Sequence, residues 1–309
     1  MTPAIETHAL AKRYGRETAL QGIDLAVEPG RVFGVIGPNG AGKTTTMRIL
    51  LDIIRPTSGS VRVLGEDPRT AGPALRRRIG YLPGELTMDA RLSARALLTH
   101  YAQLNGSRDT ARISTFAERL GLDLGRPVRS LSKGNKQKVG LVQAFAHSPD
   151  LLVLDEPTSG LDPLVQQEFL TMVREARDAG QTVFLSSHVI SEIEQVADEV
   201  AVLRDGRIVD VSTVDRLRAA ALRDVRVTVP ASAGATLASR LERLDGAQGV
   251  TVVTAQGHDI VSARLREGIP HFLAALTEAD VLDLVVQEPD LERAVLQFYG
   301  TASSEEATA

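Results

Sequence analysis

Short apolar segments alternate with longer segments of helical periodicity along most of this chain. Apolar runs that are short and bounded by turn residues are typical of buried parallel strands. Four such runs lie at residues 32–36, 151–154, 183–185 and 200–203. Residues 86–148 differ, because they hold few β-branched runs and many Ala, Leu, Arg and Gln residues. We expect a helical insertion there, within an α/β domain from about residue 3 to residue 215.

The segment from residue 222 to residue 300 has a different rhythm. Its pattern predicts strand, helix, strand, strand, helix and strand at residues 225–229, 235–244, 250–254, 260–264, 269–278 and 281–286. This β-α-β-β-α-β order is that of the split βαβ, ferredoxin-like arrangement, so we expect a small α+β domain. A last helix is expected at residues 291–298, and the small, polar, acidic tail at 301–309 is expected to be disordered.

The length, composition and net charge of the chain exclude several classes of site and partner. The 309 residues suffice for about two domains, and the absence of cysteine excludes disulfides, thiolate nucleophiles and cysteine-based zinc sites. A net charge of -4 argues against nucleic acid as the main partner. The first residues lack a signal-peptide pattern, and no apolar run approaches the ~20 residues that span a bilayer. We therefore expect a cytoplasmic protein; at a membrane, another chain would supply the spanning part.

A glycine-rich segment follows the first apolar run and precedes a helical run. It fits the pattern G-x-x-x-x-G-K-[ST] at every fixed position. Glycines let backbone N–H groups surround phosphate oxygens, and the helix adds the positive end of its dipole. Lys43 would reach the β- and γ-phosphates, and the Thr44 hydroxyl would bind Mg²⁺. The alternative is an ordinary glycine-rich turn. The predicted nucleotide-binding residues are Gly37, Pro38, Asn39, Gly40, Ala41, Gly42, Lys43, Thr44 and Thr45.

Two carboxylates follow the apolar run at residues 151–154. Ligands of parallel α/β sheets bind at the carboxyl ends of the strands. Asp155 could hold Mg²⁺, and Glu156 could take a proton from the water that attacks the γ-phosphate. Acidic residues after a strand can instead cap a helix. Together with the glycine-rich loop, the pair favours hydrolysis of a nucleoside triphosphate.

Further motifs follow in a fixed order along the chain. They are Leu131-Ser132-Lys133-Gly134-Asn135, Ser159-Gly160-Leu161-Asp162, His188 and, before all of them, Tyr14. With the phosphate loop and the acidic pair, they resemble the ATP-binding subunits of ABC transporters over roughly residues 4–215. The resemblance implies an α/β fold over residues 1–215, a P-loop NTPase core of the ABC cassette type. That fold has a parallel sheet core, an N-terminal antiparallel β part and the helical insertion.

The resemblance also implies a mechanism. Two copies would face each other head to tail, with each ATP between the phosphate loop of one copy and the signature of the other. Ser132, Lys133, Gly134 and Asn135 form this signature. Closure would bring Asp162 and His188 to the γ-phosphate, and Tyr14 would stack on adenine. The implied partners are a second copy and an integral-membrane permease that exports a substrate, which places the chain at the inner face of the cell membrane.

The chain departs from the family pattern at two places. Lys133 and Asn135 replace the usual glycine and glutamine of the signature, a variant that resembles the exporter branch of daunorubicin-type resistance and ABC-2 systems. Gly84 stands where the family usually places a glutamine. Because Gly84 has no side chain to bind Mg²⁺, we expect Glu85 to contribute to Mg²⁺ binding, as an oxygen ligand, or to coupling.

Other interpretations stay open. His188 could be a surface histidine at the start of a helix, and Tyr14 could pack against the N-terminal strands. The basic run Arg76-Arg77-Arg78 is typical of a solvated helix face. The C-terminal block has no metal-ligand spacing, and it could serve dimer contact, regulation or packing alone. The whole chain could also be a nucleotide-dependent interaction module or an ABC ATPase outside transport.

Overall fold

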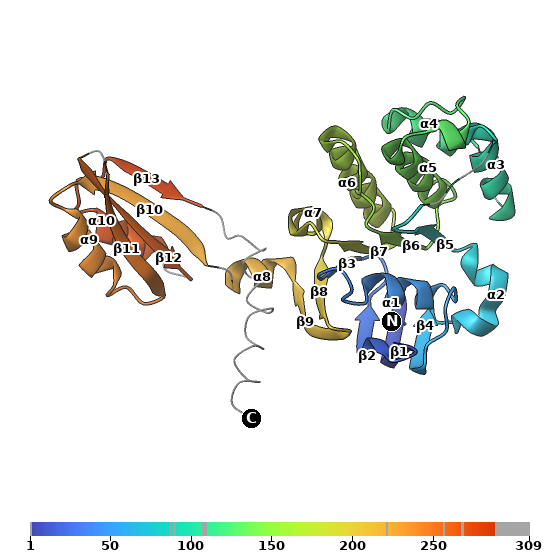
Figure 1. Ribbon diagram of the computed structural model, residues 1–309, viewed down its shortest axis with the longest axis horizontal. Coiled ribbons are helices and arrows are strands. Elements are labelled where there is room, and N and C mark those ends of the chain that lie inside the picture. The colour runs from blue at the N-terminus through green and yellow to red at the C-terminus, as the bar shows by residue number, and fades with distance from the viewer. Residues whose placement is uncertain are drawn as a thin grey trace. The chain divides into compact units, whose positions relative to one another are not determined.

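The computed structural model describes residues 2–86, 88, 91–106, 110–220, 222–255, 257–266 and 269–287. The chain forms two compact units that divide between Ser212 and Thr213 (Figure 1). The helix expected at residues 291–298 and the tail at 301–309 lie outside the described residues. Each unit has its own hydrophobic core.

A six-stranded sheet forms the centre of the first unit. Its strand order is β5 (Ile79–Leu82), β6 (Leu151–Asp155), β7 (Thr182–Ser187), β3 (Val32–Ile36), β8 (Glu199–Arg204) and β9 (Arg207–Thr213). The strands from β5 to β8 pair in parallel, and every residue of β3, β6 and β7 is buried. All four strands predicted from apolar runs are confirmed. Continuous apolar runs form strands here because both faces of a parallel sheet are covered.

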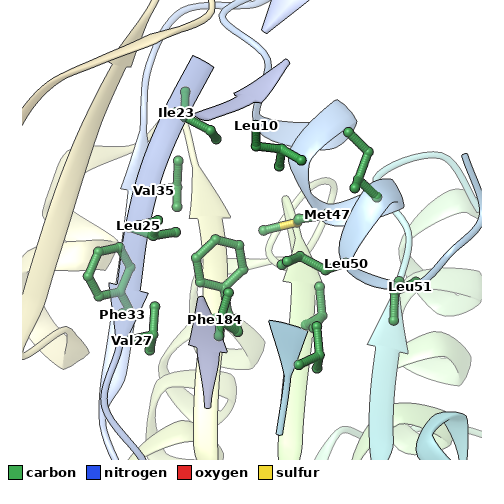
Figure 2. Packing of buried hydrophobic residues seen from close by; sticks show 14 of the residues in the cluster. Leu10, Ile23, Leu25, Val27, Phe33, Val35, Met47, Leu50, Leu51 and Phe184 are labelled. Atoms are coloured by element: carbon green, nitrogen blue, oxygen red, sulfur yellow. The ribbon is translucent and has the colours of Figure 1, made fainter. Parts of the chain in front are cut away.

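An antiparallel sheet lies beside the central sheet, in the order β2 (Glu17–Val27), β1 (Ile5–Tyr14) and β4 (Ser58–Val63). Helix α1 (Lys43–Leu50) packs into the same core as both sheets. Figure 2 shows Leu10, Ile23 and Leu25 of the antiparallel sheet near Phe33, Phe184 and the α1 residues Met47 and Leu50. The rings of Phe33 and Phe184 are stacked, with their centroids 5.9 Å apart. This packing fixes the helix whose first residue is Lys43.

The predicted helical insertion is confirmed between β5 and β6. It consists of α3 (Ala94–Leu104), α4 (Ala111–Arg119), the short 3₁₀ helix η1 (Val128–Ser130) and α5 (Lys133–Phe145). Arg119 of α4 pairs with Glu168 and Glu175 of α6 (Pro163–Asp178), at 2.5 Å and 2.7 Å. At the end of α5, Phe145 contacts the ring of Phe116 on α4 and that of Phe169 on α6. The insertion is therefore joined to the core by ion pairs and by aromatic contacts.

Three further helices are α2 (Pro68–Arg76), α7 (Ile190–Val196) and α8 (Val214–Ala220). Helix α2 follows β4, and α7 connects β7 to β8. Helix α8 begins the second unit. None of the described helices is long and apolar enough to cross a membrane.

The second unit has the predicted order of elements: β10 (Arg223–Pro230), α9 (Gly234–Leu241), β11 (Ala247–Ala255), β12 (His258–Leu265), α10 (Ile269–Leu276) and β13 (Asp283–Val286). Its strands form an antiparallel sheet in the order β11-β12-β10-β13. Alternate residues of β10 and β12 pack with α9 and α10 around Phe272. The ferredoxin-like prediction is confirmed, with element bounds that shift by at most three residues.

His147, in the turn after α5, makes the stability of the first unit depend on pH. Burial lowers the pKa of His147, and the charge of Arg112 lowers it further. The unfolded chain, with a histidine pKa near ~6.5, therefore takes up this proton before the folded chain does. We expect unfolding by urea, followed by circular dichroism, to become easier as the pH falls below ~6.5, and less so in His147→Gln. Equal slopes in the two proteins would contradict this assignment.

Candidate functional site

A cleft of about 610 Å³ opens at the carboxyl ends of the central strands. Its lining comes from segments that are far apart in sequence but follow β3, β5, β6 and β7. The lining residues are Asn39, Thr44, Arg48, Gly84, Glu85, Asp155, Glu156, Ser159 and His188. Six of the predicted site residues are thus brought together: Asn39, Thr44, Glu85, Asp155, Glu156 and His188. Ligands of parallel sheets bind at this edge.

The loop between β3 and α1 needs glycine for steric reasons. A Cβ added at Gly37 would lie 2.3 Å from the carbonyl oxygen of Leu203, and Gly42 has a φ of 110°. The loop leads into α1, where no side chain caps the first turn. The first N–H groups of α1 have no helical acceptor, so they form a positive end that suits an anion. A turn without ligand would be capped more simply by a Ser or Asp side chain.

Lys43 is buried and points back into the loop. Its ammonium group donates to the carbonyl oxygens of Gly37 at 2.7 Å and Pro38 at 3.3 Å. The same group lies 3.6 Å from a carboxylate oxygen of Glu156. Ala41 and Thr45 belong to the same loop and helix start, but they do not line the cleft. The ammonium group therefore lies between the loop and the acidic pair, where a phosphate would have to bind.

Asp155 is fully buried at the end of β6. Its Oδ1 accepts a hydrogen bond of 2.6 Å from the hydroxyl of Ser186, while its buried Oδ2 has no hydrogen-bond partner among the described residues. A Cβ added at Gly84 would lie 3.1 Å from that Oδ2. Buried carboxylate oxygens need a donor or a cation. The unpartnered oxygen, with Thr44 lining the same cleft, fits a divalent cation.

The hydroxyl of Tyr81, on β5 three residues before Gly84, is affected by the charge of the same carboxylate. Burial raises the pKa of the Tyr81 hydroxyl, and the negative charge of Asp155 raises it further. Arg48 opposes both effects through its charge and a hydrogen bond to the hydroxyl. Arg48 therefore brings a positive charge to the floor of the cleft.

Glu156 has a φ of 49°, a left-handed conformation that is unusual for a residue with a side chain. Its backbone N–H donates to the hydroxyl of Ser186 at 3.1 Å. Its carboxylate contacts Nδ1 of the His188 ring, and it accepts from the His188 backbone N–H at 3.4 Å. The His188 side chain is 61% exposed, so one face of it stays open to a ligand. The catalytic candidates Lys43, Glu156 and His188 thus form one contact group.

The other predicted residues do not line this cleft. Tyr14, at the end of β1, is 45% exposed, with the ammonium group of Lys12 4.9 Å from its ring centre. Ser132 caps α5 by accepting from the N–H of Asn135 at 3.3 Å, and Asp162 caps α6 by accepting from Val165 at 3.1 Å. The side chain of Lys133 packs near Gly160, as does Gly134. Ser132 and Asp162 thus mark the starts of α5 and α6.

Several buried polar side chains around the site were missed by the sequence analysis. Gln137 of α5 donates to the carbonyl oxygens of Glu156 and Pro157. Glu192 of α7 accepts from Thr158 at 2.7 Å and from Ser187 at 2.9 Å. Glu192 lies four residues after His188, in a helical pattern where an acidic residue is usually solvated. No local signal distinguishes it, because both of its partners are distant in sequence or lie in another element.

Comparison with known proteins agrees with this geometry. Residues 20–159 match the family model described as "ABC transporter". The chain is 36% identical over 307 residues to the daunorubicin resistance ATP-binding protein DrrA3 of Streptomyces coeruleorubidus, covering 96% of each. It is 37% identical over 221 residues to the bacitracin transport ATP-binding protein BcrA of Bacillus licheniformis, covering 71% of this chain and 72% of the relative.

Solved structures give the same result. The structure of an ATP-binding subunit of an ABC transporter matches with a TM-score of 0.65 and 28% identity, covering 70% of this chain and 92% of that one. A dimeric bacterial ABC transporter cassette matches with a TM-score of 0.63 over 68% of this chain and 98% of that one, at 21% identity, and shows the fold alone. On its motifs, its cleft and its relatives, the chain belongs to the family of ABC transporter ATP-binding proteins.

Proposed function

We propose that this chain binds Mg-ATP and hydrolyses ATP to ADP and phosphate, at the interface of a head-to-tail dimer that powers export through a separate membrane permease. The observation that carries the proposal is the cleft lined by Thr44, Asp155 and Glu156 at the start of α1, with the ammonium group of Lys43 3.6 Å from the Glu156 carboxylate. An ammonium group, a helix N-terminus and two carboxylates provide for both the anionic phosphates and their cation.

The proposed reaction is an attack of water on the γ-phosphorus. Glu156 orients the water and takes one of its protons, a bond forms between the water oxygen and phosphorus, and the bond from the γ-phosphorus to the bridging oxygen of ADP breaks. The His188 ring, in contact with Glu156, orients the carboxylate and the γ-phosphate. Lys43 exchanges its loop carbonyls for oxygens of the β- and γ-phosphates, which stabilises the charge on the leaving ADP.

The magnesium ion would be held by Thr44 and Asp155, with Glu85 as a further ligand in reach of the same cleft. The unpartnered Oδ2 of Asp155 supports this assignment. When bound, the ion supplies positive charge that neutralises the triphosphate.

The remaining site residues belong to the dimer in this proposal. Ser132, Lys133, Gly134 and Asn135 lie outside the cleft of their own chain, which fits donors that meet the nucleotide of the second copy. Asp162 would join them at closure, and Tyr14 would stack on adenine. We assign residues 1–215 to the cassette, with its helical part at 86–148, and residues 222–300 to dimer contact or regulation. The permease would hold the assembly at the inner face of the cell membrane.

The proposal is tested with the purified full chain. We expect a fluorescent ATP analogue to bind with an affinity that depends on magnesium, and phosphate release to saturate with ATP. Absence of magnesium-dependent binding, with or without a permease in vesicles, would overturn the proposal. Binding without hydrolysis would favour the second candidate, a nucleotide-dependent interaction module, for which Gly84 in place of the family's glutamine is the supporting observation.

The role of Glu85 gives a separate prediction. Glu85 is exposed at the cleft, beside Gly84 and near Asp155. If it binds the magnesium ion, Glu85→Ala should raise the magnesium concentration at half-maximal ATPase rate by about 10-fold, the effect of losing one of several weak oxygen ligands. Glu66→Ala, at an exposed glutamate outside the cleft, is the control. An unchanged magnesium dependence would remove Glu85 from the ligand set.

A further inference from the structure

Gln137 is a buried amide one turn inside α5, and the reaction proposed above gives it no role. Its Nε2 donates two hydrogen bonds to the loop that follows β6, at 3.2 Å to the carbonyl oxygen of Glu156 and 3.0 Å to that of Pro157. The side chain therefore uses both amide protons on the backbone of the residue proposed as the base and of its neighbour. A buried amide needs hydrogen-bond partners, and here both partners belong to the acidic loop.

The backbone of Glu156 needs this support. A left-handed φ is disfavoured for a residue with a Cβ, so surrounding contacts must hold it. The N–H of Glu156 is held by Ser186, and the carbonyl is held by Gln137. The direction of the carboxylate toward Lys43 and His188 follows from this backbone conformation.

The start of α5 packs on the same loop. A Cβ added at Gly134 would lie 2.6 Å from the carbonyl oxygen of Gly160, and the Lys133 side chain lies 3.7 Å from the position of a Cβ on Gly160. Gln137, Lys133 and Gly134 thus join one helix to the segment from Glu156 to Gly160. The contact is made over the whole first turn of α5 rather than by one side chain.

We infer that Gln137 is a positioning residue for Glu156: it holds the base in its left-handed conformation and ties it to the helix that begins with the signature. The inference rests on the proposed function, since it concerns the base of that reaction. Gln137 does not line the cleft, and its amide donates to the carbonyl oxygens of Glu156 and Pro157, so it acts through the acidic loop. Losing it should slow hydrolysis while leaving nucleotide affinity intact.

The first test compares Gln137→Leu with Gln143→Leu, the same replacement six positions later on α5. Leucine has a similar volume but donates no hydrogen bond. We expect Gln137→Leu to lower kcat by about 10- to 100-fold, the effect of a small misplacement of a reacting group. The dissociation constant of a fluorescent ATP analogue should stay within about twofold, and Gln143→Leu should resemble the parent protein.

The second test uses Gln137→Glu. A carboxylate cannot donate to the two carbonyls, whereas the protonated acid can donate to one of them. Burial favours the protonated form. We expect the activity of Gln137→Glu, relative to the parent protein at each pH, to rise as the pH is lowered. A residue that only packs would give a flat ratio, and unfolding midpoints at each pH show whether the variant is folded.

The outcomes separate this inference from the proposed function. If the parent protein hydrolyses ATP and folded Gln137→Leu matches it in kcat, the inference is wrong and the proposed function stands. If affinity and kcat fall together by the same factor, Gln137 supports the binding site as a whole, and the inference is also wrong. A parent protein that binds no ATP removes the proposed function itself.

Discussion

Glu156→Gln should abolish turnover while ATP still binds. Glutamine keeps the shape of the side chain but cannot accept the proton of the attacking water, and general bases contribute about 10²- to 10⁴-fold to such reactions. We expect phosphate release to fall by at least about 100-fold, with the affinity for a fluorescent ATP analogue within a few-fold of the parent value. Bound ATP that is not hydrolysed should also hold the dimer together, which light scattering can measure.

The matched control is Glu28→Gln, at an exposed glutamate between β2 and β3. It makes the same chemical change without touching the cleft, so turnover should not change. Equal turnover in Glu156→Gln and the parent protein would exclude Glu156 as the base. Absence of phosphate release from both proteins, together with a nucleotide-stabilised dimer, would favour the interaction module over the transporter subunit.

Lys43→Met should remove most of the affinity for ATP. Methionine keeps much of the buried stem but removes the ammonium group. That group lies between the loop carbonyls and Glu156, where it is expected to bind the phosphates. A hydrogen bond to a charged group contributes about 1.5–3 kcal/mol, which corresponds to roughly 10- to 100-fold in affinity. We therefore expect the dissociation constant for Mg-ATP, measured by calorimetry, to rise by at least about 10-fold.

Lys138→Met on α5 serves as the control, because it removes the same charge outside the cleft. The loss of affinity in Lys43→Met should shrink for ADP, since one of the two expected phosphate contacts is then absent. An equal loss for ATP and ADP would mean that Lys43 contacts only the β-phosphate.

The elements that carry the phosphate loop and the acidic pair could be predicted from the sequence, and the reason is physical. Strands β3 and β6 are buried on both faces, so their residues must be apolar, and the polar residues at their ends stand out as functional. The second unit was predictable for a related reason. Its inner strands β10 and β12 have one buried face, and their alternation of apolar and polar residues follows from it.

The supports of the site were not predictable in this way. Ser186 lies within an apolar strand, Gln137 within a helix of mixed composition, and Glu192 on a short helix, and each finds its partner only through the tertiary fold. Long-range hydrogen bonds leave no periodic signal in a single sequence. The unpartnered Oδ2 of Asp155 is likewise a consequence of the packing around Gly84. From the sequence, Gly84 stands out only because it occupies the place of the family's glutamine.

Helix α5 is clamped at both of its ends. Its first turn packs on the segment from Glu156 to Gly160, and its last residue, Phe145, lies in the aromatic contacts with Phe116 and Phe169. A helix behaves as a stiff rod, and one of 13 residues is about 20 Å long. Any swing of the helical insertion must therefore drag the acidic loop with it. Movement of the helical insertion and hydrolysis at Glu156 are therefore mechanically coupled through α5. A substitution that alters one of them should also alter the other.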